Sequence, residues 1–587
     1  MLERRPSWLV APDSTSIRLE PLSQEESEEL LDVLRGDAEV SPDVLAAIAA
    51  AAEGNPLFVE QMLAMIKETG DSTGELTIPP TIHALLAARL DRLEPEERAL
   101  IERASVIGRE FWRGAVVHLS PEEERSSVST HLITLVRKEL IRPYRSIFRW
   151  DDGFRFRHIL IRDEAYIGIA KETRADLHER FAAWLEGTAR ERTSDIDEIL
   201  GYHLEQAFRY RRELGPIDEA GRRLATRAGE RLAAAGRRAL ARGDARAASS
   251  LLARATSLVP QETPGREDLL VLLGGALVIA GEFPRAEAAL GEAVETSAAA
   301  GNRRTELHAL LERNFLHALT DPVGGGPELR RATEQALPEL EQLGDNLGLA
   351  KTWRRIADVH WLQNHWDEQQ VALEKAIAHA RLAGDEREAA VSLMRLPMAL
   401  YYGRIAARDA RPRAEEILEQ AHGARMVESS ARVCLAGLEA MSGRFGDARE
   451  LLARGRGIAE ELGLRVWIGG YSLLANDIEM LVGDPAAAEK ELRRGYAILE
   501  EIGERGVLAR VAAALARALF EQGQDDEAAR FAEQSATLGS ADVASQISLQ
   551  AVRGRLAARR GDMEAAETFV QDALRLVAAD DEEAVLP

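Results

Sequence analysis

The stretch Gly483-Asp484-Pro485-Ala486-Ala487-Ala488-Glu489-Lys490-Glu491-Leu492 decides the fold, because its pattern recurs along most of the 587-residue chain. A turn-forming residue is followed by alanine about five positions later and by leucine or phenylalanine four positions after that. The turn positions are Gly243, Gly281, Pro322, Asn364, Gly403, Gly443, Gly483, Gly523 and Gly561. They stand 38 to 42 residues apart, and such a regular period indicates a repeat architecture.

Each repeat is predicted to be a helical hairpin. Glycine allows the tight turn between two helices, since it tolerates positive φ without a steric penalty. Alanines such as Ala448 and Ala488 let the helices approach closely, and Leu452 and Leu492 fill the groove one turn later. A single hairpin cannot bury its apolar face, so neighbouring hairpins must stack into a superhelical array.

The Gly–Ala–Leu order and a closing proline such as Pro260 resemble tetratricopeptide repeats, although that family has a period of 34 residues. The longer period indicates longer helices over roughly residues 220–580. The resemblance implies a protein or peptide ligand on the concave face of the array. No side chain identifies that ligand, and a purely structural spacer is the alternative interpretation.

The composition excludes several classes of protein. Apolar residues make up 46% of the chain and charged residues 29%, which is globular composition rich in helix formers. The one cysteine, Cys434, has no partner for a disulfide, so a reducing, cytoplasmic location is expected. The longest apolar run, Leu269–Gly281, is too short to span a membrane, and the N-terminus lacks the apolar core of a signal peptide.

The net charge of −24 makes a general nucleic-acid or anionic-membrane surface unlikely on electrostatic grounds. Residues 1–80 carry 5 basic and 16 acidic side chains, whereas residues 81–215 carry 23 and 24. None of the six lysines follows a glycine, so the chain has no GxxxxGK[ST] phosphate loop. We therefore expect this chain to hold no nucleotide cofactor by itself.

Before the repeats, residues 53–60 read Glu-Gly-Asn-Pro-Leu-Phe-Val-Glu, which taken alone predicts a corner between two helices. This corner begins a series of four blocks. They are GNPLFVEQM (54–62), IPPTIHALLAARLDRL (78–93), ERALIERASVIGREF (97–111) and FRFRHILIRDEAY (154–166). Blocks of this kind, in this order and followed by repeats, resemble the bacterial STAND-type signalling ATPases related to AAA+ proteins. These include large LuxR-type regulators and ATPases fused to class III adenylate or guanylate cyclases.

The resemblance implies three parts. Residues 1–80 are the end of an NTPase domain and its helical lid, residues 81–215 are a winged helix with connecting helices, and residues 216–587 are an α-solenoid of about nine hairpins. In that family the phosphate loop precedes the part that starts here. The chain therefore resembles the C-terminal portion of a larger regulator, and its expected partners include an upstream ATPase or effector module.

Two nucleotide-binding residues follow from the resemblance for a complete parent protein. Pro56 corresponds to the lid proline that packs on adenine, and His158 resembles the winged-helix histidine that senses the diphosphate of ADP. An imidazole can donate a hydrogen bond to a phosphate oxygen, so the role is chemically sensible. The alternative is that His158 only closes a strand-to-helix turn.

The winged helix has its own local signals. Residues 121–139 are predicted to form an amphipathic helix, and residues 140–141 and 154–156 to form the strands of the wing. The segment from Arg137 to Arg157 contains seven cationic and three carboxylate side chains, which gives a local net charge of +4. A basic wing could bind DNA, but docking on the acidic segment 1–80 is the favoured interpretation.

Motifs for catalysis are missing from the sequence. The twelve histidines show no HExxH or paired Cys/His spacing for a metal, and no GxSxG nucleophile turn is present. His360 and His365, beside Trp361 and Trp366, are interpreted as packing in the groove of a repeat.

The sequence therefore predicts a mainly α protein with no catalytic and no metal-binding residue of its own. Its expected function is signal transduction, with a repeat array that senses a ligand and is coupled to an ATPase switch on a separate or missing module. The alternatives are a fragment of an ATP-binding cyclase or LuxR-type transcriptional regulator, and a standalone tetratricopeptide scaffold.

Overall fold

The structure, a computed structural model, describes residues 20–35, 40–69, 81–146, 151–188, 193–321, 323–421, 423–539 and 543–583. It divides into two compact units, Met1–Ala225 and Thr226–Pro587. The division falls within α11 (Glu219–Ala241). Among the described residues, no helix combines the length and the apolar character needed to cross a membrane.

The first unit starts with a small helical bundle. Its helices are α1 (Gln24–Arg35), α2 (Pro42–Ala52), α3 (Pro56–Thr69) and α4 (Ile82–Asp91). Leu31, Ile48 and Met62 bury their side chains in its core. The corner predicted at Glu53 is present, and Glu53 and Gly54 both adopt positive φ between α2 and α3.

A second group of helices with a small sheet follows the bundle, in the region that was predicted to be a winged helix. Its helices are α5 (Pro95–Ile107), α6 (Arg113–Leu119), α7 (Val128–Arg137), α8 (Ile159–Ile167), α9 (Lys171–Thr188) and α10 (Thr193–Leu214). Its antiparallel sheet has the order β1-β3-β2, from β1 (Glu110–Trp112), β2 (Ile141–Tyr144) and β3 (Gly153–Phe156). Phe111 lies opposite Phe154 and Ile141 lies opposite Phe156. The two predicted strands are confirmed, and β1 is an addition that the sequence analysis missed.

The helix predicted over residues 121–139 is wrong at its N-terminal end. A short 3₁₀ turn, η3 (Glu122–Glu124), comes first, and α7 begins only at Val128. Pro121 lacks an N–H and precedes three adjacent glutamates, so the first turn closes with the tighter 3₁₀ bond from the Glu124 amide to the Pro121 carbonyl. Leu132 and Leu135 point inward as predicted.

Three of the described cations between residues 137 and 157, namely Lys138, Arg155 and Arg157, form ion pairs within the predicted winged helix. Lys138 Nζ lies 2.6 Å from Glu97, and Arg155 Nε lies 3.8 Å from Glu110. All these carboxylates belong to residues 81–215 rather than to the acidic segment 1–80. Docking of the wing on that segment stays a prediction, and Arg149 lies outside the described residues.

Two histidines form a buried hydrogen-bonded pair between α9 and α10. His178 Nδ1 lies 2.8 Å from His203 Nδ1, and the Tyr166 hydroxyl lies 2.8 Å from His178 Nε2. Burial lowers the pKa of His178 well below its usual value, and burial together with the nearby Arg162 lowers the pKa of His203 to about 3. Both rings are therefore neutral in the folded protein near pH 7.

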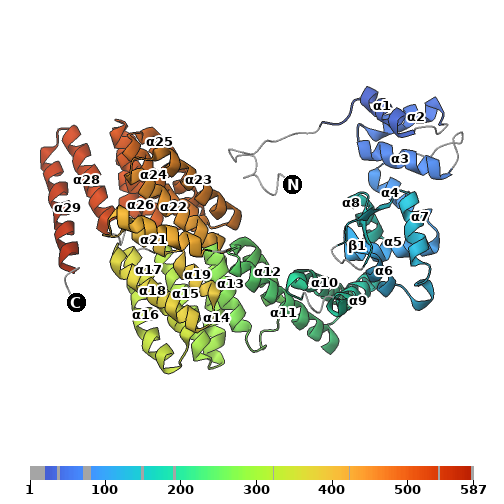
Figure 1. The fold of residues 1–587 in the computed structure, drawn as a ribbon, viewed down its shortest axis with the longest axis horizontal. Helices are drawn as coiled ribbons and strands as arrows, with labels where there is room; N and C mark the ends of the chain where they lie inside the picture. Colours follow the sequence, from blue (N-terminus) through green and yellow to red (C-terminus); the bar gives the residue numbers. More distant parts are fainter. Residues whose placement is uncertain are drawn as a thin grey trace. The chain divides into compact units, whose positions relative to one another are not determined.

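The second unit is an array of antiparallel helical pairs (Figure 1). Its helices after α11 are α12 (Ala245–Leu258), α13 (Arg266–Ala280), α14 (Phe283–Ala299), α15 (Arg303–Thr320), α16 (Gly325–Gln342), α17 (Asn346–Leu362), α18 (Trp366–Leu382), α19 (Glu386–Leu393), α20 (Leu396–Tyr402), α21 (Ala407–Gln420), α22 (Arg425–Met441), α23 (Phe445–Leu462), α24 (Arg465–Val482), α25 (Pro485–Ile502), α26 (Gly506–Glu521), α27 (Asp525–Leu538), α28 (Val543–Arg559) and α29 (Met563–Glu583). Each of the nine predicted turn positions falls between two of these helices, although Pro322 itself lies outside the described residues. The α-solenoid of helical hairpins is confirmed.

Seven of the nine turn positions have the left-handed backbone that the sequence analysis required, whereas Gly403 has φ of −70°. Gly483 has φ of +84°, and Asn364 takes the same region with φ of +59°. A second set of left-handed glycines, which the sequence analysis did not single out, lies about half a period later, between successive hairpins. This set is Gly301, Gly344, Gly384, Gly423, Gly463, Gly503 and Gly539. Both turns of the repeat therefore end a helix in the same way.

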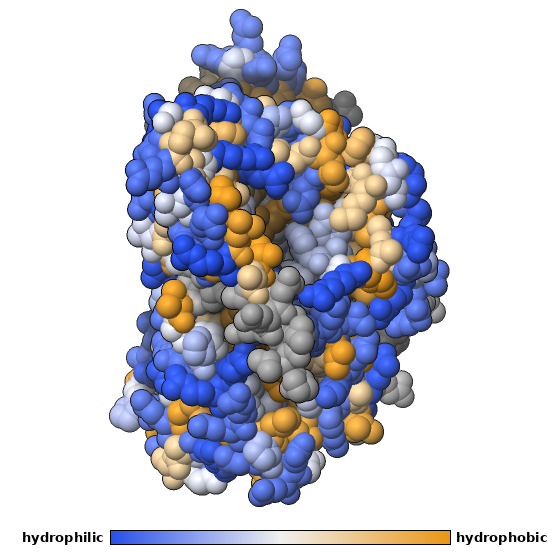
Figure 2. Space-filling view, turned by 90° about the vertical axis from the view of Figure 1, so that its left-hand side faces the viewer, coloured by the Kyte–Doolittle hydropathy of each residue, from blue (hydrophilic) through white to orange (hydrophobic). Residues whose placement is uncertain are grey.

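Alanine contacts hold the two helices of each hairpin close together. Ala448 and Ala488 are fully buried, and Leu492 is buried one turn later. In the last hairpin the buried alanine is Ala566, five positions after Gly561. Figure 2 shows the face on the side of α28 and α29, where hydrophilic residues dominate and hydrophobic residues form separate small patches.

The superhelix closes on itself, because helices that belong to hairpins four or five positions apart in the array come into contact. α13 contacts α24, and α15 contacts α26. The Arg505 backbone amide donates to the Leu319 carbonyl at 2.9 Å, across this seam. The Arg510 side chain donates to the Trp361 carbonyl at 3.2 Å. The seam encloses the inner side of the array.

Two glycines where an added Cβ would meet no atom within 4 Å, Gly483 and Gly457, allow a test of the turn geometry. Gly483→Ala is expected to destabilise the array by about 1 kcal/mol, because an L-residue with a Cβ is strained at positive φ. Gly457→Ala, in the middle of α23, is expected to stabilise it by about 0.5–1 kcal/mol, since alanine favours a helix. Urea unfolding measures both, and equal signs would contradict the proposed role of the turn.

The buried histidine pair predicts acid sensitivity of the first unit. Both histidines have folded-state pKa values below the usual 6.5, so their stabilising contribution is complete above about pH 6.5. It is lost as the pH falls toward the folded-state values, because only the unfolded chain gains protons. The loss is about 1.4 kcal/mol per pH unit for each histidine.

Thermal unfolding between pH 7.5 and 5 is the measurement. His203→Gln should show a flatter dependence of the melting temperature on pH than the parent chain. His131→Gln, on α7, is the control and should keep the parent's slope. A slope unchanged in His203→Gln would show that the pair does not set the acid response.

Candidate functional site

A cavity of about 500 Å³ lies inside the second unit. This volume is typical of sites for small organic ligands. Seven helices that stand first in their hairpins contribute to its wall: α13, α15, α17, α20, α24, α26 and α28. Residues as far apart in the sequence as Val278 and Ser548 therefore line one cavity. It exists because the superhelix closes.

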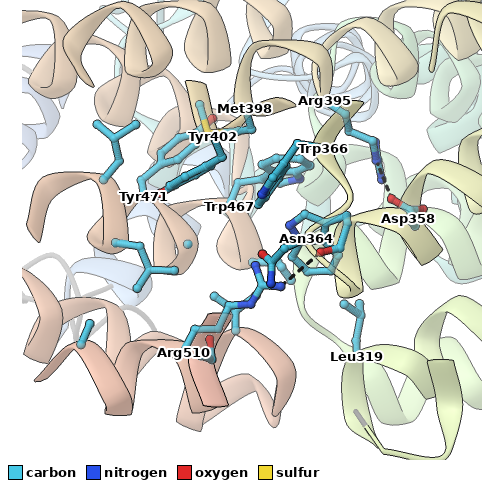
Figure 3. A pocket seen from close by; sticks show the side chains of 18 of the residues that line it. Leu319, Asp358, Asn364, Trp366, Arg395, Met398, Tyr402, Trp467, Tyr471 and Arg510 are labelled. Atoms are coloured by element: carbon cyan, nitrogen blue, oxygen red, sulfur yellow. Dashed lines mark hydrogen bonds and ion pairs between the residues drawn. The ribbon is translucent and has the colours of Figure 1, made fainter. Parts of the chain in front are cut away.

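Aromatic side chains form much of the wall. Trp366 at the start of α18 stacks on Tyr402 at the end of α20, with ring centroids 5.0 Å apart. Trp361, Trp467 and Tyr471 also line the cavity. Figure 3 shows the labelled rings gathered at the centre of the pocket. Such rings bind flat apolar groups well, since each offers a large rigid face.

The cavity also has charged side chains over these rings. The Arg395 guanidinium lies 5.5 Å from the ring centroid of Trp467, and the Arg510 guanidinium lies 5.0 Å from that of Trp361. In Figure 3, Arg395 and Arg510 approach the rings from different sides. Cations over indole rings are held by the negative face of the ring, which fixes these guanidiniums at the cavity wall.

A break in a helix positions Arg395. α19 ends at Leu393 and α20 begins at Leu396, because Pro397 has no N–H and its ring clashes with the carbonyl four residues earlier. The sequence analysis predicted a helical hairpin here and did not single out this break in its first helix. In the break, Arg395 Nη1 donates to the Val391 carbonyl at 2.8 Å and Nε donates to Asp358 Oδ1 at 3.0 Å.

Behind Arg395 lies a fully buried network of ion pairs. Glu312 accepts from Arg354 Nη2 at 2.9 Å and from Arg355 Nη2 at 2.6 Å. Arg354 also donates to Glu388, and Arg355 donates to Asp358. Burial by itself raises the pKa of Glu312, but Arg355 and Arg354 outweigh burial and hold that pKa well below its usual range. The network is therefore charged, and it reaches the cavity through Asp358.

A second carboxylate faces the cavity from α24. Asp477 accepts from the Tyr401 hydroxyl at 3.4 Å and from Asn476 Nδ2 at 3.2 Å. Burial raises the pKa of Asp477 to about 6, because no guanidinium pairs with it closely enough to compensate. Asp477 therefore gains a proton in mildly acidic solution, unlike the carboxylates of the ion-pair network.

The two residues predicted from the resemblance lie in the first unit, at helix N-termini. Pro56 is the first residue of α3, which the Asn55 side chain caps by accepting from the Leu57 amide at 3.0 Å. His158 precedes α8, and its Nδ1 accepts from the Leu160 amide at 3.2 Å. Both residues thus have a structural place, and their nucleotide-binding role stays a prediction. Neither belongs to the cavity of the second unit.

The sequence analysis missed most of the cavity residues. It noted His360, His365 and their neighbouring tryptophans as groove packing, and the two imidazole rings do lie together, 6.2 Å apart across the turn. The remaining signal was Arg354-Arg355 followed by Asp358, three charged residues on one helical face of an otherwise apolar stretch. In the described part of the chain, no three His, Cys, Asp or Glu residues are grouped to hold a metal ion.

Comparisons with known proteins are consistent with a helical-repeat architecture but do not assign a family. No family model matches the chain, and no curated protein does. A solved structure of a STAND protein with a tetratricopeptide repeat sensor, from Pyrococcus horikoshii, is similar at 15% identity and a TM-score of 0.41, over 89% of this chain and 73% of that one. A Rap protein complexed with Competence and Sporulation Factor is similar at 14% identity and a TM-score of 0.38, over 55% and 99%. Yeast Tom70 is similar at 12% identity and a TM-score of 0.31, over 70% and 96%.

The fold and the cavity together define the second unit as an α-solenoid of helical hairpins with a pocket on its inner side. At such identities and TM-scores the similarities define neither a relative nor a function. The pocket itself is the feature that carries a functional interpretation.

The buried network gives a direct test by substitution. Glu312→Gln is expected to cost about 3 kcal/mol of the free energy of unfolding, because two buried guanidiniums then share the charge of only Glu388 and Asp358. Glu339→Gln removes the acceptor of Arg303 at an exposed pair and should change stability very little. Urea unfolding of both variants is the measurement, and similar losses in the two would contradict the role of the buried network.

Proposed function

We propose that this chain is the sensing and relay part of a signal-transduction protein. In this proposal the enclosed pocket of the repeat array binds a ligand, which is a small molecule or a peptide segment. The bundle and winged helix of the first unit pass the bound state to an ATPase switch module in the cytoplasm. The chain is assigned binding, and no catalytic step is assigned to it.

The observation that carries the proposal is the composition of the pocket wall. Its residues come both from α13–α20 and from α24–α28, which meet only when the superhelix is closed. A ligand in the pocket would contact both parts and so favour the closed superhelix over more open ones. A ligand can shift a conformational equilibrium only through such differential contacts. Ligand binding thereby changes the curvature of the whole array.

The relay part of the proposal rests on the order of the sequence blocks in residues 54–166, and the three-stranded sheet among helices α5–α10 supports the proposed winged helix. A bundle, a winged helix and a repeat array in this order support a coupling role between a sensor and a nucleotide-dependent switch. Pro56 and His158 are the proposed contacts to a nucleotide bound by that switch.

A filled pocket tests the sensing function. Gly470 lines the cavity, and the closest atom to an added Cβ is a Val507 methyl group 3.9 Å away, so Gly470→Phe should place its ring in the cavity. The purified chain is exposed to a cell extract, washed and analysed by native mass spectrometry for retained small molecules or peptides. We expect a retained species that Gly470→Phe loses and that Gly457→Phe, with its ring outside the cavity, keeps.

Hydrogen exchange supplies the second readout. With the retained species added back, backbone amides of α13–α20 and of α24–α28 should both exchange more slowly, because the ligand bridges them. Retention that is equal in Gly470→Phe, or no retained species at all, would favour a scaffold whose partners bind elsewhere on the array.

A further inference from the structure

We propose that the pocket selects an anion carried on a flat aromatic body, with Arg395 and Arg510 binding the anion and the tryptophan and tyrosine rings binding the aromatic part. The inference rests on the proposed sensing function and specifies the class of its ligand. A carboxylate and a phosphate ester share this chemistry, and the experiment below begins with a carboxylate.

The charge around the pocket is opposite to that of the chain. Arg395, Arg510 and Arg517 line the cavity together with two carboxylates, Asp358 and Asp477. The layer behind this wall adds Lys351, Arg354, Arg355 and Arg387 against Glu312 and Glu388. Seven cations therefore face four carboxylates in a chain with a net charge of −24. Such a local excess of positive charge attracts an anion and repels a cation.

Arg395 has the geometry of an anion-binding residue. Its side chain is about nine-tenths buried, with 10% exposed, so its donors act where water competes weakly. Two of its three nitrogens are engaged, Nε by Asp358 and Nη1 by the Val391 carbonyl. Among the described residues Nη2 has no acceptor, although Arg395 lines the cavity. A guanidinium held in this way has its remaining donors oriented before a ligand arrives.

The two carboxylates of the pocket wall, Asp358 and Asp477, differ in how strongly they oppose the binding of an anion. Asp358 is bound by both Arg355 and Arg395, so its charge is already matched. Asp477 is the remaining negative group, and its neighbours Tyr401 and Asn476 are neutral. Asp477 should therefore weaken the binding of an anion, and removing its charge should strengthen that binding.

The shape of the apolar wall favours an aromatic body. Trp366 and Tyr402 stack face to face at one side, and Trp467 lies under Arg395. The pocket thus offers ring faces next to guanidinium groups, as Figure 3 shows for the labelled side chains. An aromatic ring bonded directly to an anionic group could contact the rings and a guanidinium at once, whereas an aliphatic anion would lose the stacking.

The test uses 2-naphthoate, with 2-naphthamide as its uncharged analogue and cyclohexanecarboxylate as its aliphatic one, titrated into the full chain by isothermal calorimetry. We expect 2-naphthoate to bind at least tenfold more tightly than either analogue. Arg395→Gln should weaken 2-naphthoate at least tenfold and change 2-naphthamide much less. Arg413→Gln, on the exposed side of α21, should leave all three affinities unchanged.

A second variant, which is expected to strengthen binding, distinguishes a change in the pocket from a folding defect. Asp477→Asn should bind 2-naphthoate severalfold more tightly than the parent chain, and no folding defect would produce such a gain. Circular dichroism and thermal melting check that each variant is folded. Failure of 2-naphthoate to bind, or equal binding of 2-naphthamide, overturns the ligand class.

The two proposals fail in different ways. If Gly470→Phe still loses the species retained from extract while 2-naphthoate does not bind, the sensing function stands and the ligand class is wrong. If Gly470→Phe keeps the retained species, the sensing function itself is wrong, because the pocket is then not where the ligand binds.

Discussion

The architecture of the second unit depends on one backbone constraint, the left-handed turn that ends each helix at a nearly constant interval. At Gly483 and at most of its equivalents the chain reverses with positive φ, and most helices between turns, apart from the short α19 and α20, are therefore of similar length. Helices of equal length stack in register, with alanines such as Ala488 at their closest approach. A constant rotation from one hairpin to the next then accumulates into a superhelix. The closed seam between α13 and α24 and between α15 and α26 is the consequence.

The buried ion pairs occupy positions that apolar side chains could fill. Glu312, Arg354 and Arg355 could be replaced by packed apolar residues without loss of stability, because removing charges from water is costly even when they are paired. Their place in the molecule gives a reason for their presence. The network runs from Glu388 through Glu312 to Asp358, and Asp358 fixes Arg395 at the pocket wall. The network therefore links the orientation of the Arg395 side chain to the three neighbouring helices α15, α17 and α19.

The predictable parts of the fold were those with local causes. The nine turns and the two helices of each hairpin followed from glycine, alanine and leucine spacing, and the wing strands from two short apolar segments. β1 was missed because Glu110-Phe111-Trp112 is too short to show alternation, and it is a strand only through pairing with β3. The break at Pro397 was also missed, although proline is a local signal, because the period of the repeat favoured a continuous helix.

What the sequence by itself determined is the repeat and its helical hairpins, since these depend on contacts between residues close in the chain. Only the tertiary structure decided the pocket. Phe315, Arg395, Trp467 and Arg510 meet because many small rotations between hairpins add up to a closed turn, and no pattern within a single repeat records that sum. The charge of the pocket is likewise invisible in the composition, because its cations come from separate repeats of an acidic chain. The physical reason is that hairpin formation is local, whereas superhelix closure depends on packing between distant segments.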